Sequence, residues 1–452
     1  MSAKPILASV RPSACPGLLR IVASKDGGIC RIKLPLGRLD ADGARAIAEA
    51  ARRHADGVLE ATNRANLQIR GVHAGAETAL SSELLAAGLG PRDLAADDVR
   101  NLLVSPTLGR DASAVLDAGP LAQNLLDLLQ DTPRFHALSP KFALQLDAGE
   151  ALAMLEHPND IWLSALADAD GPLFAFGLAG CPPQREEAAL ALAAVRAEQV
   201  PQLVEHLLHL FLDLAGDGLT RMRHLCAQFG DAQVLERLQQ RLPFALLSDA
   251  RITAWRRPAV TPFAYLGIAA QRQPGRYSVG ANCALGRLDS DTLHGLAALA
   301  ERYSAGHLCL TPWQGVLLPD VAEAQAETAL AELAGLGLLT DAAQPLARLI
   351  ACSGSSGSSG CARGLADTKA DALRLATRLR NAPPVAVHLC GCPRSCAAAH
   401  TAPYTLLAVA DGHYDLFRRA PGTAGFGLPV ARHLTLDAAG DLLAVPGALP
   451  DA

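Results

Sequence analysis

Leu36-Gly-Arg-Leu-Asp40 recurs in this chain as Leu285-Gly-Arg-Leu-Asp289, 249 residues later. The match continues without a gap to Thr62 and Thr311, and 12 of the 27 aligned positions are identical. A repeat with so long a period is typical of a duplicated domain. The sequence therefore predicts a protein built from two related halves.

Each copy of the repeat has the pattern of a small α/β unit. Residues 29–34 alternate between apolar and basic side chains, which predicts a half-buried strand. Asp40 is a good helix N-cap, and the apolar face that follows it ends before Gly57. Residues 58–72 predict two strands with a turn at Asn63 and Arg64. The second copy predicts a helix over 290–303 and a turn at 312–315.

The segments after the two copies also correspond. The first is followed by a predicted helix (116–129) and strand (142–146), and the second by a helix (367–380) and strand (385–389). This overlay places Ser105 opposite Cys352, and a helical stretch, 186–241, bridges the halves. We therefore predict an α/β (α+β) fold with pseudo-twofold symmetry. Its four expected units are residues 1–80, 81–250, 251–325 and 326–452.

Cysteines are concentrated near the C-terminus. Cys352 and Cys361 flank a Gly/Ser tract that composition predicts to be a flexible loop, and Cys390-Gly-Cys392-Pro-Arg-Ser-Cys396 follows a predicted strand. Thiolates delivered in pairs from two loops are how proteins hold a 4Fe–4S cluster. Structural zinc and inert buried thiols are the alternatives, although zinc pairs more often have a two-residue gap. Cys390 could also replace a neighbour as a ligand.

The remaining cysteines are scattered, and we interpret them as core or surface thiols: Cys15, Cys30, Cys181, Cys226, Cys283 and Cys309. A net charge of −5 gives no reason to expect nucleic acid or an acidic membrane surface as a partner. The sequence contains no uncharged apolar stretch of about eighteen residues and no apolar signal region. We therefore expect a cytoplasmic protein.

The duplicated halves, the motif Thr62-Asn-Arg-Ala-Asn-Leu-Gln-Ile-Arg70, Val99-Arg-Asn101 and the Gly391–Cys396 turn resemble the sulfite/nitrite reductase superfamily. Three shorter motifs resemble the precorrin-3B synthase family within it. They are Ala14-Cys-Pro-Gly-Leu18, Thr311-Pro-Trp-Gln-Gly-Val-Leu-Leu318 and Cys361-Ala-Arg-Gly-Leu365. The resemblance covers about residues 10–410. It implies two ferredoxin-like half-domains and two larger α/β domains.

The resemblance also implies a set of site residues. A 4Fe–4S cluster would be held by Cys352, Cys361, Cys392 and Cys396. A tetrapyrrole would lie in the crevice between the halves, bound by Arg31, Arg64, Arg100, Asn101 and Lys141. Arginine suits this role because its planar fork binds carboxylates in bidentate pairs.

Two features depart from the family pattern. Sulfite reductases have a Lys-x-Lys pair where this chain has Lys141-Phe-Ala143, and a missing second lysine argues against reduction of a small anion. The gap between Cys352 and Cys361 is eight residues, longer than is usual in the family.

The implied reaction joins precorrin-3A and dioxygen. It hydroxylates a meso carbon, closes a γ-lactone to give precorrin-3B, and needs two external electrons. The absence of a flavin or nicotinamide motif from the sequence predicts a separate reductase or ferredoxin as donor. Family members are thought also to use a mononuclear non-haem iron, but no histidine pattern identifies its ligands. His136, His388 and His400 are interpreted as structural.

Two alternative functions remain open at this point. One is a siroheme-dependent sulfite or nitrite reductase. The other is a non-catalytic iron–sulfur protein that carries tetrapyrrole or senses redox state.

Overall fold

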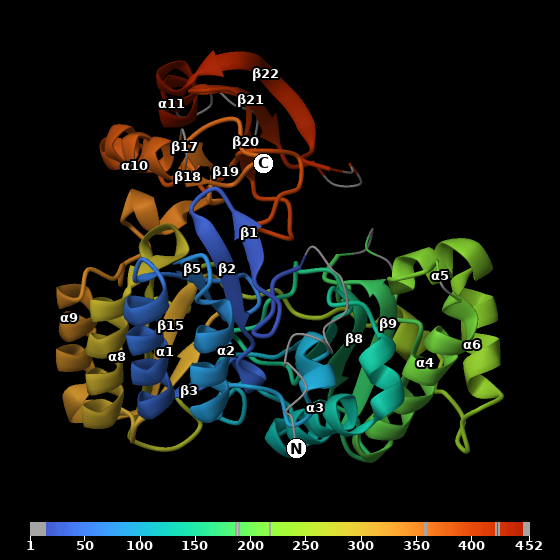
Figure 1. Cartoon of the computed structure of the whole chain (residues 1–452). Helices are drawn as coiled ribbons and strands as arrows, with labels where there is room; N and C mark the ends of the chain where they lie inside the picture. The colour runs from blue at the N-terminus through green and yellow to red at the C-terminus, as the bar shows by residue number, and fades with distance from the viewer. Residues whose placement is uncertain are drawn as a thin grey trace.

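The computed structural model describes residues 15–445 except 186, 187, 189, 217, 357, 358, 421, 422 and 424. Ala14 and Glu186, which belong to stretches singled out above, lie outside the described residues. The described chain forms four five-stranded sheets, two in the small units and two in the larger ones. Figure 1 shows the small units side by side, with the larger units adjoining them.

The small units exchange a strand, and the exchanged strands are the repeated motif itself. In the first sheet the order is β1-β2-β5-β4-β13, and in the second it is β11-β12-β15-β14-β3. β3 (Arg38–Asp40) therefore pairs with the second unit, through Leu39 and Leu308, and β13 (Arg287–Asp289) pairs with the first. The other strands of the two sheets are β1 (Val22–Ser24), β2 (Gly27–Ile32), β4 (Val58–Ala61), β5 (Leu67–Val72), β11 (Gly267–Ala270), β12 (Arg276–Asn282), β14 (His307–Leu310) and β15 (Gly315–Ala322).

The turn before each exchanged strand has the same unusual backbone. Leu36 and Leu285 have φ angles of 56° and 54°, a region that leucine seldom adopts, and a glycine follows each. Asp40 and Asp289 then cap α1 (Ala41–His54) and α8 (Ser290–Tyr303), accepting hydrogen bonds from Gly43 N and Thr292 N. The predicted helix starts are thus confirmed.

One hydrophobic core serves both small units. α1 packs against α8, and α2 (Glu77–Ala86) and α9 (Ala326–Gly335) flank that pair, so four helices cover the two sheets (Figure 1). Buried side chains from both halves, among them Ile47 and Leu296, belong to the same cluster. The boundary expected at residue 80 falls inside α2, and the one at 325 falls just before α9.

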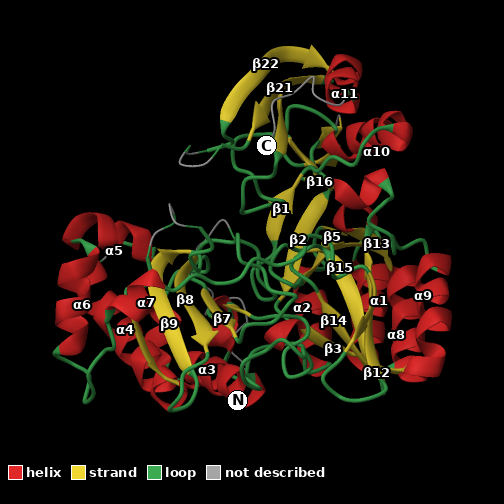
Figure 2. Ribbon diagram, turned by 180° about the vertical axis from the view of Figure 1, so that it is seen from behind, coloured by secondary structure: helices red, strands yellow, loops and turns green. Residues whose placement is uncertain are grey.

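The two larger units share one topology, seen from behind in Figure 2. In each, a short strand pairs in parallel with a second strand, which pairs in parallel with a third, and two antiparallel strands follow. The first sheet contains β6 (Leu102–Leu103), β7 (Leu144–Asp147), β8 (Asn159–Leu166), β9 (Leu173–Gly180) and β10 (Ala193–Arg196). The second contains β16 (Leu349–Ala351), β19 (Val387–Cys390), β20 (Tyr404–Ala410), β21 (His413–Arg418) and β22 (Leu428–Thr435). The predicted overlay of the halves is therefore confirmed.

Helices cover these sheets, and each larger unit has its own core. They are α3 (Gly119–Asp131), α4 (Val200–Ala215), α5 (Met222–Phe229), α6 (Asp231–Gln239), α7 (Ala250–Ala254), α10 (Thr368–Arg378) and α11 (Leu436–Ala444). The helical bridge is predicted wrongly at its start, because β10 occupies 193–196 before α4 begins. No helix in the described residues is long and apolar enough to cross a membrane.

Candidate functional site

The four cysteines predicted as cluster ligands gather at the C-terminal ends of β16 and β19. Burial raises the pKa of the Cys396 thiol, and the neighbouring Cys392, Cys352 and Cys361 thiols add to that rise. Cys352 leaves β16 directly, while Cys392 and Cys396 belong to the turn after β19. The structure thus brings the two cysteine pairs together from the two loops.

The Gly/Ser tract forms a short hairpin, which corrects the flexible loop expected from composition. β17 (Ser355–Ser356) pairs antiparallel with β18 (Ser359–Gly360), and the tip, residues 357–358, lies outside the described residues. The Cys361 N–H donates to the Gly354 carbonyl oxygen at 2.6 Å, which closes the hairpin. The long gap therefore returns Cys361 to the neighbourhood of Cys352.

Glycines let the segments around the cysteines approach closely. A Cβ on Gly391 would lie 3.3 Å from Cys352 Sγ and 3.3 Å from Gly364 Cα, and one on Gly364 would lie 2.8 Å from the Gly354 backbone. The Gly391 N–H consequently donates to Cys352 Sγ at 3.1 Å, and the Arg363 N–H to Cys361 Sγ at 3.5 Å. Such amide donors stabilise thiolates that hold a cluster and help to set its potential.

The spacing of these thiols is informative about the metal. Among the described residues, no three His, Cys, Asp or Glu side chains stand close enough to hold one metal ion. A structural zinc site needs four ligands around a single ion, at about 2.3 Å for each sulfur. In a 4Fe–4S cluster the four thiolates bind the corners of a larger body, so they can lie farther apart. Four cysteines delivered from two loops are the ligand set that a 4Fe–4S cluster requires.

Glu60, which the sequence gave no reason to select, joins the first small unit to the cysteine group. Its buried carboxylate lies 3.6 Å from Lys369 Nζ and 3.3 Å from Arg287 Nη2, and it accepts from Ser353 Oγ at 3.3 Å. These cations hold the pKa of Glu60 below its usual value despite burial. On the same side of the molecule, Lys25 N donates to the Gly360 carbonyl at 3.0 Å.

Arg31 and Arg64 lie together beside the cysteine turn. Asn63, next to Arg64, donates to the Cys396 carbonyl oxygen at 3.3 Å, which fixes their unit against that turn. Burial lowers the pKa of Arg31, and nearby Cys396 partly offsets the effect. Burial also lowers the pKa of Arg64 to about 10, with repulsion from Arg221 and Arg31 adding to the shift. Neighbouring cations that repel one another favour an anionic ligand.

The other three predicted binding residues are placed differently. Arg100 is buried, and its guanidinium donates to Asp97 Oδ1 at 3.3 Å and to the Gly90 carbonyl at 3.1 Å. Asn101 Nδ2 donates to the carbonyls of Asp98, Pro140 and Phe142, so it anchors the loop that carries Lys141. Lys141 itself is exposed. Arg100 and Asn101 are therefore held by protein groups, and Lys141 is the exposed member of the three.

Two of the three histidines interpreted as structural have protein partners. His136 Nε2 lies 2.8 Å from the Gln130 carbonyl oxygen, and a His388 ring nitrogen lies 3.2 Å from Cys390 Sγ. The third, His400, lies near His157, which the sequence gave no reason to select. The strand register pairs Leu144 with Ile161 in the first half and Val387 with Tyr404 in the second, and this correspondence matches His157 with His400. The two histidines lie near enough to influence each other's charge.

His157 makes stability depend on pH. Burial lowers its pKa to about 3, with Arg64 and His400 adding to the shift, so the folded protein keeps it neutral. The unfolded chain would bind the proton below about pH 6.5, so this contribution to stability is complete above pH 6.5. It is lost at about 1.4 kcal/mol per pH unit as pH falls toward 3.

We expect the wild type to lose about 1 kcal/mol more than His157→Gln between pH 7 and pH 5.5, by the same linkage. Urea unfolding at the two pH values measures the difference, and His307→Gln, at an exposed histidine, is the control. Equal losses in the wild type and His157→Gln would show that His157 titrates normally.

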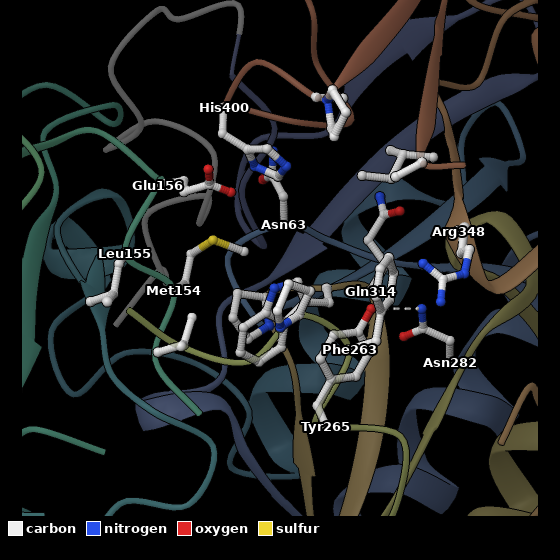
Figure 3. A pocket seen from close by; sticks show the side chains of 18 of the residues that line it. Asn63, Met154, Leu155, Glu156, Phe263, Tyr265, Asn282, Gln314, Arg348 and His400 are labelled. Carbon is white, nitrogen blue, oxygen red and sulfur yellow. Dashed lines mark hydrogen bonds between the residues drawn. The ribbon is translucent and has the colours of Figure 1, made fainter. Parts of the chain in front are cut away.

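A cavity of about 330 Å³ is lined by residues of both halves (Figure 3). Its walls come from the loop 151–156, the turn 312–314 and the segment 346–350. None of the five predicted binding residues lines it. With the offset of the repeat, Arg64 corresponds to Trp313 and Lys33 to Asn282, and both of these second-half residues line the cavity. Asn63 and His400 also line the cavity, so it borders the cysteine turn beside which Arg64 lies.

Comparison with known proteins supports these observations. The family model described as "Nitrite/Sulfite reductase ferredoxin-like half domain" matches residues 22–87 and 269–336, which are the two small units. The model described as "Nitrite and sulphite reductase 4Fe-4S domain" matches residues 95–246. That segment is the first larger unit, whereas the four gathered cysteines lie in its counterpart.

Individual relatives agree with this assignment. Ferredoxin–nitrite reductase of Zea mays is 30% identical over 82% of this chain and 68% of its own length. Precorrin-3B synthase of Sinorhizobium sp. is 25% identical over 90% of this chain and 83% of its own length. The solved structure of Mycobacterium tuberculosis NirA protein has a TM-score of 0.74 at 22% identity, and covers 92% of this chain and 79% of that one.

The chain belongs to the nitrite and sulfite reductase superfamily, whose members are oxidoreductases with an iron–sulfur domain. The predicted fold, with ferredoxin-like half-domains and mixed α/β sheets, is confirmed. The chain spans about two thirds of the length of the maize nitrite reductase.

Proposed function

We propose that this protein is a precorrin-3B synthase-like monooxygenase. The observation that carries the choice is Ala143, at the position of the second lysine in sulfite reductases. Its side chain is buried, and its N–H donates to Asp160 Oδ2 at 2.9 Å. Asp160, which also pairs with Arg221, therefore holds the backbone at this position, and the alanine side chain offers no cation to a small anion. The length of the match to the Sinorhizobium synthase supports the same choice.

Cys352, Cys361, Cys392 and Cys396 would hold a 4Fe–4S cluster, which would supply electrons one at a time from an external reductase or ferredoxin. Arg31 and Arg64 would bind the carboxylates of precorrin-3A next to the cysteine turn. Arg100 and Asn101 would hold the crevice wall, and Lys141 would add a charge at its mouth. Precorrin-3A, dioxygen, two electrons and two protons would give precorrin-3B and one water. A mononuclear iron stays a prediction without assigned ligands.

A second candidate is a siroheme-dependent nitrite reductase. It is favoured by the identity to the maize enzyme, which is higher than the identity to the synthase. In that case the crevice beside Arg31 and Arg64 would hold siroheme permanently, and the purified protein would contain it. A non-catalytic tetrapyrrole carrier would bind precorrin-3A without oxygen insertion.

The test begins with the absorption spectrum of protein purified without oxygen. A broad shoulder that bleaches with dithionite, without sharp macrocycle bands, is expected. The protein is then incubated with precorrin-3A, dioxygen and a reducing system, and mass spectrometry is used to look for a product heavier by one oxygen atom. Sharp macrocycle bands with nitrite consumption would establish the reductase instead, and binding without a heavier product would establish the carrier.

Cys390 provides a specific test of the ligand set. It is buried, and its Sγ lies against the His388 imidazole at 3.2 and 3.4 Å. Burial raises the pKa of the Cys390 thiol, with Cys352, Cys392 and Cys396 adding to the rise, so the neutral thiol is favoured. We expect Cys390→Ser to retain iron, sulfide and turnover within about twofold, because the buried Cys390 Sγ lies against the His388 ring, whereas the four proposed ligands lie in the loops after β16 and β19. Iron and acid-labile sulfide are measured per chain, and loss of both would make Cys390 a ligand.

A further inference from the structure

The cavity shown in Figure 3 has more positive than negative side chains in its lining. Arg185, Arg348 and Arg419 line it, and Glu156 is the one acid among the described residues that do so. Figure 3 shows Glu156 and Arg348 on opposite sides of the cavity. Such a lining favours a carboxylate as ligand, because the planar guanidinium group binds carboxylates in bidentate pairs.

The position of the cavity relates it to the proposed tetrapyrrole site. Asn63 lines the cavity and donates to the Cys396 carbonyl oxygen in the cysteine turn, beside which Arg64 lies. The cavity volume, about 330 Å³, is at the small end of the range for ligand pockets, so it suits one arm of a macrocycle and not the whole ring. Because the cysteine turn borders both places, a tetrapyrrole bound beside Arg64 can extend a carboxylate arm into the cavity.

Arg419 already binds a carboxylate, and that carboxylate belongs to the protein. Its Nη1 donates to Glu156 Oε1 at 2.6 Å, so the pair joins the two larger units at the wall of the cavity. Arg419 also has contacts that do not involve Glu156. Its Nη1 donates to the Thr401 carbonyl at 3.3 Å, and its backbone N–H donates to the Pro403 carbonyl at 2.9 Å. The guanidinium therefore keeps protein partners when Glu156 moves away.

The Glu156 carboxylate is only weakly held in this ion pair. Glu156 lies between the buried residues Leu155 and His157, but 49% of its own side chain is exposed, as is 31% of the Arg419 side chain. Exposed ion pairs contribute little to stability, because water solvates both charges. A ligand carboxylate at Arg419 would be shielded from water by the rest of the ligand, and shielded ion pairs are stronger. The ligand can therefore displace Glu156.

We propose that Arg419 binds a carboxylate arm of the tetrapyrrole, and that Glu156 takes the place of this carboxylate when the site is empty. Binding exchanges one carboxylate for another at Arg419, and the displaced Glu156 side chain turns toward solvent. The inference rests on the proposed function, because a substrate site is empty in the purified protein whereas a siroheme site is not.

Uroporphyrin III is a suitable probe because it is a stable, fluorescent tetrapyrrole whose side arms all end in carboxylates. Equilibrium dialysis with the full-length protein, purified without oxygen, is expected to show saturable binding of one molecule per chain. Glu156→Gln should tighten this binding about threefold to fivefold, because the competing carboxylate is removed. Glu236→Gln, at an exposed glutamate on α6, is the matched control and should leave the affinity unchanged.

A second variant shows whether Glu156 acts through Arg419. Arg419→Met should weaken uroporphyrin binding about tenfold, and in that background Glu156→Gln should have little further effect, because no guanidinium is left for Glu156 to occupy. Tightening of equal size in both backgrounds would show a general effect of charge and would overturn the exchange. The inference is also overturned if uroporphyrin does not saturate, or if Glu156→Gln binds it no more tightly than the wild type.

The failure of this inference differs from the failure of the proposed function. Oxygenation of precorrin-3A together with equal uroporphyrin affinities in the wild type and Glu156→Gln would overturn the exchange alone. The expected affinities without a heavier product from precorrin-3A would support the exchange and overturn the monooxygenase.

Discussion

Cys396→Ser is expected to give a folded protein that has lost its iron–sulfur absorption and its turnover together. Cys396 lies in the turn after β19, in electrostatic contact with the three other gathered thiols and with Arg31. A serine hydroxyl remains protonated near neutral pH, so it replaces a cluster thiolate poorly. Iron and acid-labile sulfide per chain should fall to a small fraction of the wild-type values, and product formation should fall at least about 100-fold.

Folding should survive this change because the turn carries little of the core. The Cys396 residue is exposed as a whole, although neighbouring groups surround its thiol, and the core of its unit is made from buried side chains of β16, β19, β20 and α10, among them Leu349 and Leu389. Circular dichroism and the thermal midpoint before cluster loading should therefore match the wild type. Cys181→Ser, in the first larger unit, is the matched control and should keep its cluster. An intact cluster with full turnover in Cys396→Ser would remove Cys396 from the ligand set.

The repeat predicted the equivalent elements of the two halves well, but it could not predict their pairing. Helix α8 has the bounds expected from the pattern, and Asp40 and Asp289 are the caps. Strands β3 and β13 were missed because three residues have no measurable periodicity, and their partners lie in the other half of the sequence. The hairpin at Ser355–Gly360 was missed because its glycines serve close packing, whereas composition alone predicts flexibility.

Some residues of the candidate site could likewise be predicted from the sequence, and others could not. The spacing of the cysteines predicted the four ligands, and the structure places these residues close together. The resemblance selected Arg100, but its pairing with Asp97 depends on a long-range approach of Leu18 and Leu19 to the same carboxylate. Glu60 is an isolated acid in the sequence, so no pattern could identify its role between Lys369 and Arg287. His157 is matched with His400 by the register of the strands on either side of them, which the sequence does not give.

Arg64→Met is expected to weaken ligand binding without lowering the stability of the unliganded protein. Arg64 lies beside Arg31 and Arg221. Burial of Arg64, together with repulsion from these two arginines, lowers its pKa to about 10. Methionine keeps the approximate length of the side chain and removes the charge. The unliganded protein should therefore be as stable as the wild type or more stable by about 1 kcal/mol, because a poorly compensated buried charge is gone.

Binding should change in the opposite direction. A partly buried guanidinium that pairs with a carboxylate is worth about 2–3 kcal/mol, so the affinity for precorrin-3A should fall about 30- to 100-fold. An absorbance titration measures the affinity, and the cluster spectrum should stay unchanged because Arg64 is no cluster ligand. Arg223→Met, at an exposed position on α5, is the control and should alter neither quantity. If Arg64→Met bound precorrin-3A as tightly as the wild type, the crevice beside the cysteine turn would not be the tetrapyrrole site. A surface role for Arg64 would instead predict unchanged stability together with unchanged affinity, so measuring both quantities distinguishes a binding arginine from an ordinary one.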